Sequence, residues 1–294
     1  MAALSNIFAM DLYFKIADVS ILCRTPFVVN DSSQTSDFRI QPCKAEMEFR
    51  FIPVKSLQSP AAGGVWMADS CYTTYECGTT TYHYANRNEL PYCRVIYQYE
   101  QPHYLCCEYL AGHENLMKSS NNIMHLLELE SFLLHGNTLL LHASFIRSRG
   151  RGILFSGPSG IGKSTQAALW QSFMGAEVLN GDRAGLRKTD EGWTAFGLPY
   201  AGTSGICRNE SASITAIVIL RKYSQNRLSI LSKKTAFSLL YPELTVHRWD
   251  PHFVNRAVDL LLNLLESVPV YLLECLPDED AVRTLEKKLT ERGE

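Results

Sequence analysis

The sequence has no long hydrophobic run and almost no net charge. Its most apolar stretch, AVDLLLNLLESVPVYLLEC, is interrupted by Asp259, Asn263, Glu266 and Pro269, whereas a helix that crosses a bilayer needs about 20 mostly apolar residues. The 28 Lys and Arg residues nearly balance the 30 Asp and Glu residues, so no general electrostatic attraction to nucleic acid or membranes is indicated. We therefore expect a soluble, cytoplasmic protein without nucleic-acid or membrane partners.

The chain also lacks any C-x-x-C pair, although it contains nine cysteines, seven of them in the first 110 residues. An odd number of cysteines argues against a framework of disulfides. His103, Cys106 and Cys107 are close enough in the sequence to make a zinc site an alternative. Structural zinc sites usually carry paired C-x-x-C ligands, so free thiols that pack as small hydrophobic side chains are the favoured interpretation.

The pattern of hydrophobic residues changes near residue 118. Before it, short alternating segments rich in aromatic and β-branched residues, such as FKIADVSILC (14–23) and CRVIYQYE (93–100), predict strands. In the tyrosine-rich run at 72–84, cross-strand packing is favoured over an aromatic ligand platform. We expect a β-rich N-terminal domain over residues 1–118.

Residues 119–135 have apolar positions at three- and four-residue intervals and are followed by Gly136, a pattern that predicts one helix. Strands and helices then alternate to the C-terminus, as in an α/β domain whose helices cover a mostly buried sheet. The second domain is therefore expected at residues 119–294, and the whole chain belongs to the α+β or α/β class.

One loop in this second domain carries a phosphate-binding motif. Within GILFSGPSGIGKSTQAALW (152–170), residues 157–164 fit G-x-x-x-x-G-K-[ST], with an apolar strand pattern before the loop and a helical pattern after it. Glycines allow backbone N–H groups to converge on phosphate oxygens at the positive end of the helix. Lys163 would reach the β- and γ-phosphates, and the Ser164 hydroxyl would ligate Mg²⁺. The predicted nucleotide-binding residues are Gly157, Pro158, Ser159, Gly160, Ile161, Gly162, Lys163, Ser164 and Thr165.

Asp182, at the end of the strand pattern EVLNGD, is the candidate for the acidic partner of this loop. Such a residue holds Mg²⁺ or positions the nucleophile, although Asn-Gly-Asp is also good turn chemistry. Asp182 begins a D-x-x-G sequence that GTPases also contain. No Asn in the chain is followed by Lys, so the guanine-reading N-K-x-D motif is missing and a GTPase is excluded.

The stretch LLLHASFIRSRGRGILFSGPSGIGKSTQAALWQSFMGAEVLNGD (139–182) resembles the core of the HPr kinase/phosphorylase family. The resemblance implies a nucleotide-binding fold like that of the phosphoenolpyruvate carboxykinases, and ATP-dependent phosphoryl transfer to a hydroxyl, typically of a serine. His142 falls on the strand histidine of the family, and Asp182 falls on the second of two adjacent aspartates. Gly181 replaces the first aspartate, and Thr165 stands where the family frequently has Glu.

We expect an ATP-dependent, Mg²⁺-requiring kinase that acts on a hydroxyl of a small molecule or peptide. Asp182, His142 and Lys163 would be catalytic, and Ser164 and Asp182 would hold Mg²⁺. Arg208, in a glycine-rich loop at 197–210, is either a clamp for phosphate or carboxylate or a solvated side chain. The alternative function is nucleotide-dependent binding or escort without transfer. In both cases the N-terminal half would recognise or cover the acceptor, and the oligomeric relatives of this fold make a homo-oligomer compatible with the sequence.

Overall fold

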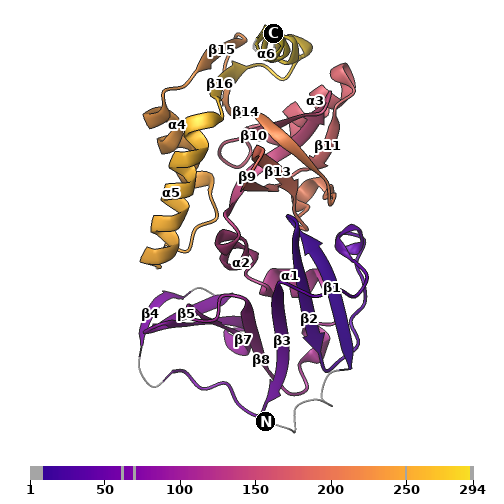
Figure 1. Ribbon diagram of the computed structural model, residues 1–294, viewed down its shortest axis with the longest axis vertical. Coiled ribbons are helices and arrows are strands. Elements are labelled where there is room, and N and C mark those ends of the chain that lie inside the picture. The colour runs from indigo at the N-terminus through magenta and orange to yellow at the C-terminus, as the bar shows by residue number, and fades with distance from the viewer. Residues whose placement is uncertain (1–8, 61–62, 69–70, 249, 292–294) are drawn as a thin grey trace. The chain divides into compact units, whose positions relative to one another are not determined.

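The computed structural model describes residues 9–60, 63–68, 71–248 and 250–291 (Figure 1). Contacts between Cα atoms divide the chain into two compact units, Met1–His135 and Gly136–Glu294, and each contains an eight-stranded sheet. The mixed class expected from the sequence is confirmed, because both units combine a large sheet with helices. Among the described residues, no helix is long and apolar enough to cross a membrane.

The first unit is built on a mixed sheet with strand order β1-β2-β3-β8-β7-β6-β5-β4. Its strands are β1 (Met10–Ile16), β2 (Val19–Thr25), β3 (Met47–Val54), β4 (Gly64–Ala68), β5 (Tyr72–Cys77), β6 (Thr80–Arg87), β7 (Leu90–Gln98) and β8 (Tyr104–Leu110). The β2–β3 and β3–β8 pairs are parallel. The segment 14–23, expected to be one strand, contains the turn of the β1–β2 hairpin, where Ala17 and Asp18 have positive φ values.

The tyrosines of the first unit pack across neighbouring strands. Tyr75 lies edge-on to Tyr84 with ring centroids 5.4 Å apart, and Tyr72 stacks on His83 at 4.9 Å. The Arg94 guanidinium lies 5.7 Å from the centre of the Tyr84 ring. Cross-strand aromatic pairs of this kind stabilise a sheet, so packing accounts for these rings.

The single helix predicted over residues 119–135 is wrong. The segment forms two short helices, α1 (Ser120–Leu126) and α2 (Leu129–His135). Glu128, between them, has a φ of +44°, a left-handed conformation that interrupts a right-handed helix. The apolar periodicity continues across the break, and periodicity alone therefore could not show it.

Both short helices are bonded to the β-rich part of the chain. Ser120 Oγ accepts a hydrogen bond from the backbone N–H of Ser32 at 2.8 Å. Nε2 of His135 is hydrogen-bonded to the Tyr97 hydroxyl. These bonds explain why the division into compact units falls after His135 and not at the boundary expected between residues 118 and 119.

The second unit contains the order β10-β9-β12-β13-β14-β16-β15, with β11 beside β9. The strands are β9 (Thr138–Ser148), β10 (Arg151–Ser156), β11 (Glu177–Asn180), β12 (Arg183–Thr189), β13 (Gly192–Gly197), β14 (Ser211–Lys222), β15 (Arg227–Ile230) and β16 (Val270–Cys275). The helices are α3 (Lys163–Met174), α4 (Lys233–Leu240), α5 (Pro251–Ser267) and α6 (Glu279–Glu291). Strand β14 pairs in parallel with both β10 and β16, so these three strands end at the same edge of the sheet.

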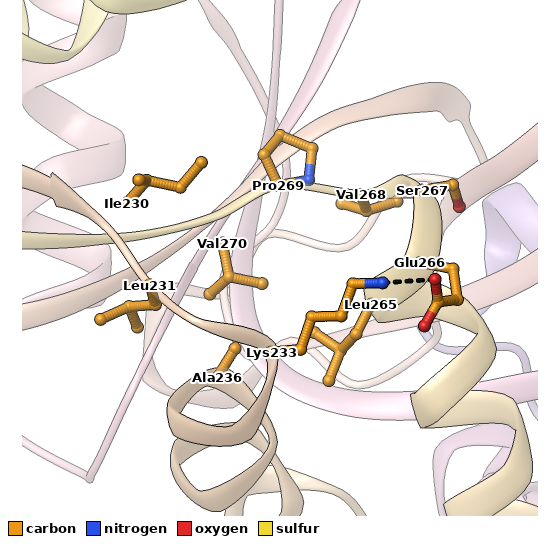
Figure 2. Close-up of a pocket in the computed structure, with 10 residues that line it drawn as sticks. All are labelled: Ile230, Leu231, Lys233, Ala236, Leu265, Glu266, Ser267, Val268, Pro269 and Val270. Atoms are coloured by element: carbon orange, nitrogen blue, oxygen red, sulfur yellow. Dashed lines mark hydrogen bonds and ion pairs between the residues drawn. The ribbon is translucent and has the colours of Figure 1, made fainter.

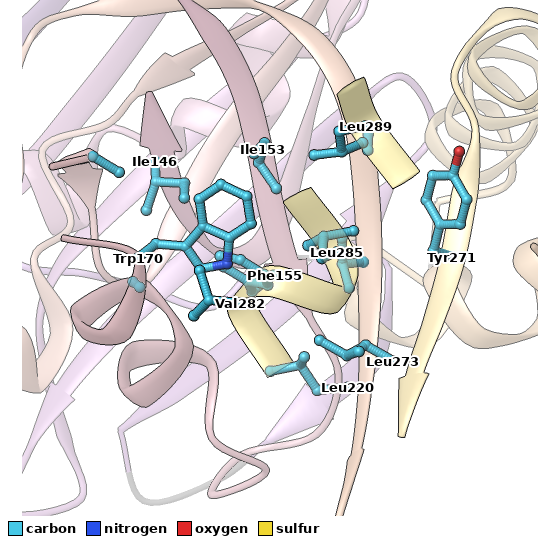
Figure 3. Close-up of a cluster of buried hydrophobic side chains, with 14 of the residues drawn as sticks. Ile146, Ile153, Phe155, Trp170, Leu220, Tyr271, Leu273, Val282, Leu285 and Leu289 are labelled. Atoms are coloured by element: carbon cyan, nitrogen blue, oxygen red, sulfur yellow. The ribbon is translucent and has the colours of Figure 1, made fainter. Parts of the chain in front are cut away.

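A buried cluster holds α3 and α6 against one face of this sheet (Figure 3). Trp170 of α3 is fully buried, and its ring centroid lies 6.3 Å from that of Phe155 in β10. The members contributed by α6 are Val282, Leu285 and Leu289. Because α3 begins at Lys163, this packing fixes the helix whose first turn carries the motif lysine.

The opposite face of the sheet is covered by α4 and α5. There, a cavity of about 200 Å³ is lined by Val270 of β16, Ala236 of α4 and Leu265 of α5 (Figure 2). An ion pair between Lys233 and Glu266 lies in its wall. The second unit thus has helices on both faces of its parallel strands, which buries the sheet and leaves the strand ends for function.

Candidate functional site

The motif loop connects β10 to α3 at the carboxyl edge of the parallel strands. Gly160 has a φ of +74° and Gly162 a φ of +118°, conformations that side-chain-bearing residues adopt only with strain. A hydrogen bond from Ile161 N to Pro158 O, 3.2 Å long, closes a turn over residues 158–161. Gly162 is the N-cap residue of α3 and supplies no side-chain cap. The first amides of the helix are therefore left for another acceptor.

Lys163 is the most informative residue of the loop. Its side chain is buried, with the residue only 7% exposed. The ammonium donates hydrogen bonds to Gly157 O at 2.7 Å and to Pro158 O at 3.2 Å. Burial lowers the pKa of Lys163 below its ordinary value, and the negative charges of Glu243 and Asp182 act in the opposite direction. The structure thus brings both carboxylates close enough to influence this lysine.

Asp182 follows β11 in a turn that its neighbour Asn180 holds. Oδ1 of Asn180 accepts hydrogen bonds from the backbone N–H groups of Asp182 at 2.8 Å and Arg183 at 2.9 Å. The amide of the same fully buried side chain donates to Leu198 O at 2.7 Å. Asn180 therefore anchors the turn that carries the Asp182 carboxylate.

His142 lies between two carboxylates. Its Nδ1 is 3.0 Å from Oε2 of Glu243, and its Nε2 is 3.9 Å from Oδ1 of Asp182. A carboxylate on Nδ1 keeps a proton on that nitrogen, so the lone pair of Nε2 faces Asp182 in the neutral ring. The arrangement can orient a reacting hydroxyl and its proton.

Sequence reasoning missed Glu243, which lies 101 residues from His142 in the chain. Glu243 ends a 3₁₀ turn at Tyr241–Glu243, and the following residues pair with β9. Leu244 forms an isolated antiparallel bridge with Leu141, and Thr245 N donates to Leu140 O at 2.9 Å. This pairing places the glutamate beside the histidine strand. Nothing in the local sequence marks it.

A second side chain that the sequence did not indicate is Arg183. Its Nε is 3.7 Å from Oδ2 of Asp182, and its NH1 donates to the Thr245 hydroxyl at 3.3 Å. Its guanidinium also lies 5.5 Å from the centre of the Tyr200 ring. The cation beside the aspartate is thus Arg183, the residue directly after Asp182.

The predicted clamp residue Arg208 is directed elsewhere by its contacts. Its side chain is about half exposed, and its NH1 lies 3.9 Å from Oε1 of Glu210. Glu210 also binds Arg147 at 2.6 Å, and Arg147 binds Glu177 at the start of β11. Asp182 follows the other end of that strand. The side-chain contacts of Arg208 therefore lead to the start of β11, whereas its backbone N–H is bonded to Leu179 O near the end that precedes the aspartate.

Gly181 stands where the resembling family has its first aspartate, and the structure shows why no side chain fits there. A Cβ at Gly181 would lie 1.9 Å from Ser204 Oγ and 2.6 Å from Ser204 Cβ. The loop containing Ser204 is paired to the β11 end, because Gly181 N donates to Ile206 O at 3.2 Å and Arg208 N donates to Leu179 O at 2.8 Å. The 197–210 loop thus leaves no room for a side chain at position 181.

Ser164 and Thr165 lie in the first turn of α3, and both are exposed. The Ser164 hydroxyl and the Asp182 carboxylate are hard oxygen donors of the kind that Mg²⁺ prefers. Over the part of the chain that the structure describes, no group of three or more His, Cys, Asp or Glu side chains is arranged to hold a metal ion.

No family model matches the chain, and no curated protein matches its sequence. Among solved structures, the Hpr(Ser) kinase/phosphatase from Coxiella burnetii is similar over 52% of this chain and 94% of its own, with 15% sequence identity and a TM-score of 0.30. A likeness with so low a TM-score supports no conclusion about this chain.

Proposed function

We propose that the protein is an ATP-dependent kinase that uses Mg²⁺ and transfers the γ-phosphoryl group to a hydroxyl of a small molecule or peptide. The proposal includes a phosphoenolpyruvate carboxykinase-like nucleotide-binding fold for residues 136–294. The observation that carries it is the buried ammonium of Lys163 at the positive end of α3. A buried cation at a helix N-terminus is unfavourable by itself. A polyphosphate would offset both the positive charge and the uncapped amides.

In the proposed step, the acceptor oxygen forms a bond to the γ-phosphorus while the bond from that phosphorus to the bridging β,γ-oxygen breaks. Lys163 exchanges its bonds to the loop carbonyls of Gly157 and Pro158 for bonds to the β- and γ-phosphates. The acceptor hydroxyl donates a hydrogen bond to the lone pair on Nε2 of His142, which orients the hydroxyl and takes its proton. The Asp182 carboxylate, 3.9 Å from Nε2, stabilises the positive charge that forms on the ring. ADP is the leaving group.

The residues present fit a Mg²⁺ ion that shares its ligands with the nucleotide. Asp182 and Ser164 would supply two oxygens, and the phosphates would supply others. The bound ion contributes neutralisation of the charge on the β- and γ-oxygens. The bond from the backbone N–H of Asp182 to Asn180 would hold the turn that carries this carboxylate in place as the ion binds.

Isothermal titration of Mg-ATP into the full chain tests the phosphate site. Lys163→Ala should weaken ATP binding at least tenfold, because it removes the only cation within the loop sequence at 157–165. Lys233→Ala is the matched control, since Lys233 is an exposed lysine paired with Glu266 and should leave the affinity unchanged. Undiminished binding by Lys163→Ala would contradict the proposal.

A nucleotide-dependent binding or escort protein without transfer activity is the second candidate. The lack of room for a side chain at Gly181 favours this second candidate. The resembling family has two adjacent aspartates, and the first of them could not be accommodated here. In this case the nucleotide would stabilise a conformation that binds the acceptor, and ATP would be hydrolysed slowly or not at all.

Incubation with γ-labelled ATP and an extract of the organism that encodes the protein distinguishes the two candidates. For the kinase, label enters a metabolite or peptide, and Asp182→Asn abolishes the transfer while keeping the size of the side chain. Asp190→Asn, in the exposed β12–β13 turn, should transfer normally. Slow release of phosphate without a labelled product would instead support the binding protein.

The acceptor itself would be selected by the β-rich N-terminal half. The loop, the aspartate and the histidine all belong to the second unit, and the first 118 residues contain no phosphate-binding motif. Because the residues proposed for the reaction all lie in the second unit, we assign recognition of the acceptor to the N-terminal half.

A further inference from the structure

A cavity of about 420 Å³ lies beside the phosphate loop, within the second unit. It opens at the edge where β10, β14 and β16 end. The loop and α3 contribute Gly160, Ile161, Gly162, Thr165 and Gln166, the end of β14 contributes residues 220–223, and the end of β16 and the next residues contribute 275–277. The carboxyl ends of parallel strands are the usual place for ligands in α/β sheets, and this volume is in the range of small-molecule pockets.

The order of the strands sets the direction in which a nucleotide would lie. Strand β10 has β9 on one side and β14, followed by β16, on the other. His142 belongs to β9, so the reacting end of a triphosphate lies toward the β9 side. The cavity lies toward the β14 and β16 side of the same loop. A triphosphate held with its γ-phosphate near Asp182 would extend its sugar and base toward this cavity.

Gln166 provides an independent observation that points to a ligand. This residue lines the cavity and is only 2% exposed. Its Nε2 donates to Sγ of Cys275 at 3.4 Å, but its Oε1 is buried and has no hydrogen-bond partner among the described residues. A buried acceptor without a donor costs free energy, and an N–H or O–H group of a ligand would satisfy it.

The rest of the lining suits a flat heteroaromatic ring attached to an anion. Ile161, Leu276 and Pro277 are apolar, and Tyr223 adds an aromatic ring. Arg221 and Lys222 also line the cavity, and NH1 of Arg221 lies 3.2 Å from Oε1 of Glu274. A nucleoside requires apolar surfaces against the faces of its base and a hydrogen-bonding group at the edge of the base, and this cavity offers both.

We propose that this cavity binds the purine base and the sugar of the nucleotide whose phosphates the loop holds. The inference rests on the phosphate-binding role proposed above, and it adds a residue, Gln166, that contacts the nucleoside. The cavity would make the protein select a nucleoside triphosphate over a bare polyphosphate.

Thiol labelling of the full chain tests this without any substitution. Cys275 lines the cavity, and Cys43, an exposed cysteine of the first unit, serves as the internal reference. Burial raises the pKa of the Cys275 thiol, so maleimide labelling is run at alkaline pH and followed by mass spectrometry. ATP with Mg²⁺ should slow the labelling of Cys275 at least tenfold, and tripolyphosphate with Mg²⁺ should not.

Titration of the same two ligands into a cavity-filling variant gives a second readout. Leu276→Trp should weaken ATP binding at least tenfold and leave tripolyphosphate binding within about twofold. Leu262→Trp is the matched control, because Leu262 and Leu276 are similarly exposed, at 50% and 41%, and Leu262 lies on α5, outside the cavity.

The outcomes separate the two proposals. If both ligands bind and protect Cys275 equally, or if Leu276→Trp affects neither or both, the nucleoside cavity is wrong and the phosphate loop stands. If neither ligand binds the wild-type chain, the phosphate loop itself is wrong, and the nucleoside cavity fails with it.

Discussion

Glu243 accepts a hydrogen bond from His142 although 101 residues separate the two in the chain. Of the two carboxylates beside the histidine, it is the more buried, with its side chain 12% exposed against 32% for Asp182. A buried carboxylate that bonds to one ring nitrogen fixes both the rotation of the imidazole and the place of its proton. In the proposed reaction, Glu243 would therefore be a positioning residue that acts through His142.

Glu243→Gln should lower the rate of phosphoryl transfer by about tenfold or more, a typical cost of losing an outer partner of a functional histidine. ATP affinity should change much less, because the loop bonds of Lys163 do not involve Glu243. The proton position is measurable as well: ¹⁵N NMR of the His142 ring should show a proton held on Nδ1 in the wild type and a mixture of tautomers in the variant. Glu266→Gln, at an ion pair remote from the histidine, is the control. An unchanged ring spectrum and an unchanged rate would show that Glu243 does not position His142.

Most of the site residues predicted from the sequence lie in one short stretch, and His142, outside it, was predicted only from the resemblance to a known family. The phosphate loop, Lys163 and Asp182 occupy 26 consecutive positions, 157–182, and their spacing reflects local geometry. Glu243 could not be found in this way, because it is placed by the pairing of Leu244 with Leu141. Which arginine lies beside Asp182 likewise depends on how the 197–210 loop folds. The sequence around Arg183 and around Arg208 does not show that fold.

At the scale of elements, α3 links the core to the site. Its hydrophobic residue Trp170 is fully buried in the cluster with Phe155, and its first residue is the motif lysine. The strand, the loop and the helix were predictable because the apolar run, the glycines and the helical spacing follow one another without interruption. The division of residues 119–135 into two helices was not predictable. It comes from a positive φ at Glu128, which depends on tertiary packing, and no glycine marks the position in the sequence.

Trp170→Ala should lower the free energy of unfolding by about 3–5 kcal/mol, the usual cost of removing a buried aromatic side chain and leaving a cavity. Urea unfolding followed by circular dichroism measures the change. Phe173→Ala is the matched control, because Phe173 belongs to the same helix but is 46% exposed, and it should cost less than about 1 kcal/mol. Equal destabilisation by the two substitutions would mean that the cluster in Figure 3 does not anchor α3.

At the scale of the whole molecule, the residues assigned to the proposed reaction lie in one of two compact units. Lys163, Asp182, His142 and Glu243 all belong to Gly136–Glu294, and so do the residues that line the cavity beside the loop. The boundary expected from the sequence would add α1 and α2 to this unit. Those helices bury Ile123, Leu129 and Phe132 completely, and Ser120 is bonded to Ser32 of the β-rich unit. A fragment that begins at residue 119 would therefore expose apolar surface that the β-rich unit normally covers.

A fragment of residues 136–294 should accordingly fold and bind Mg-ATP by itself. Its affinity should stay within about tenfold of that of the full chain, a loss of no more than roughly 1.4 kcal/mol, because every group assigned to the nucleotide is retained. Transfer of label to the natural acceptor should be lost with the first unit. A fragment of residues 119–294 is the comparison, and it should be the less soluble of the two because α1 and α2 lack their partners. Isothermal titration and circular dichroism measure binding and folding on the same samples. If the shorter fragment is folded and binds no ATP, residues before 136 must contribute to the nucleotide site, and the assignment of that site to the second unit is wrong.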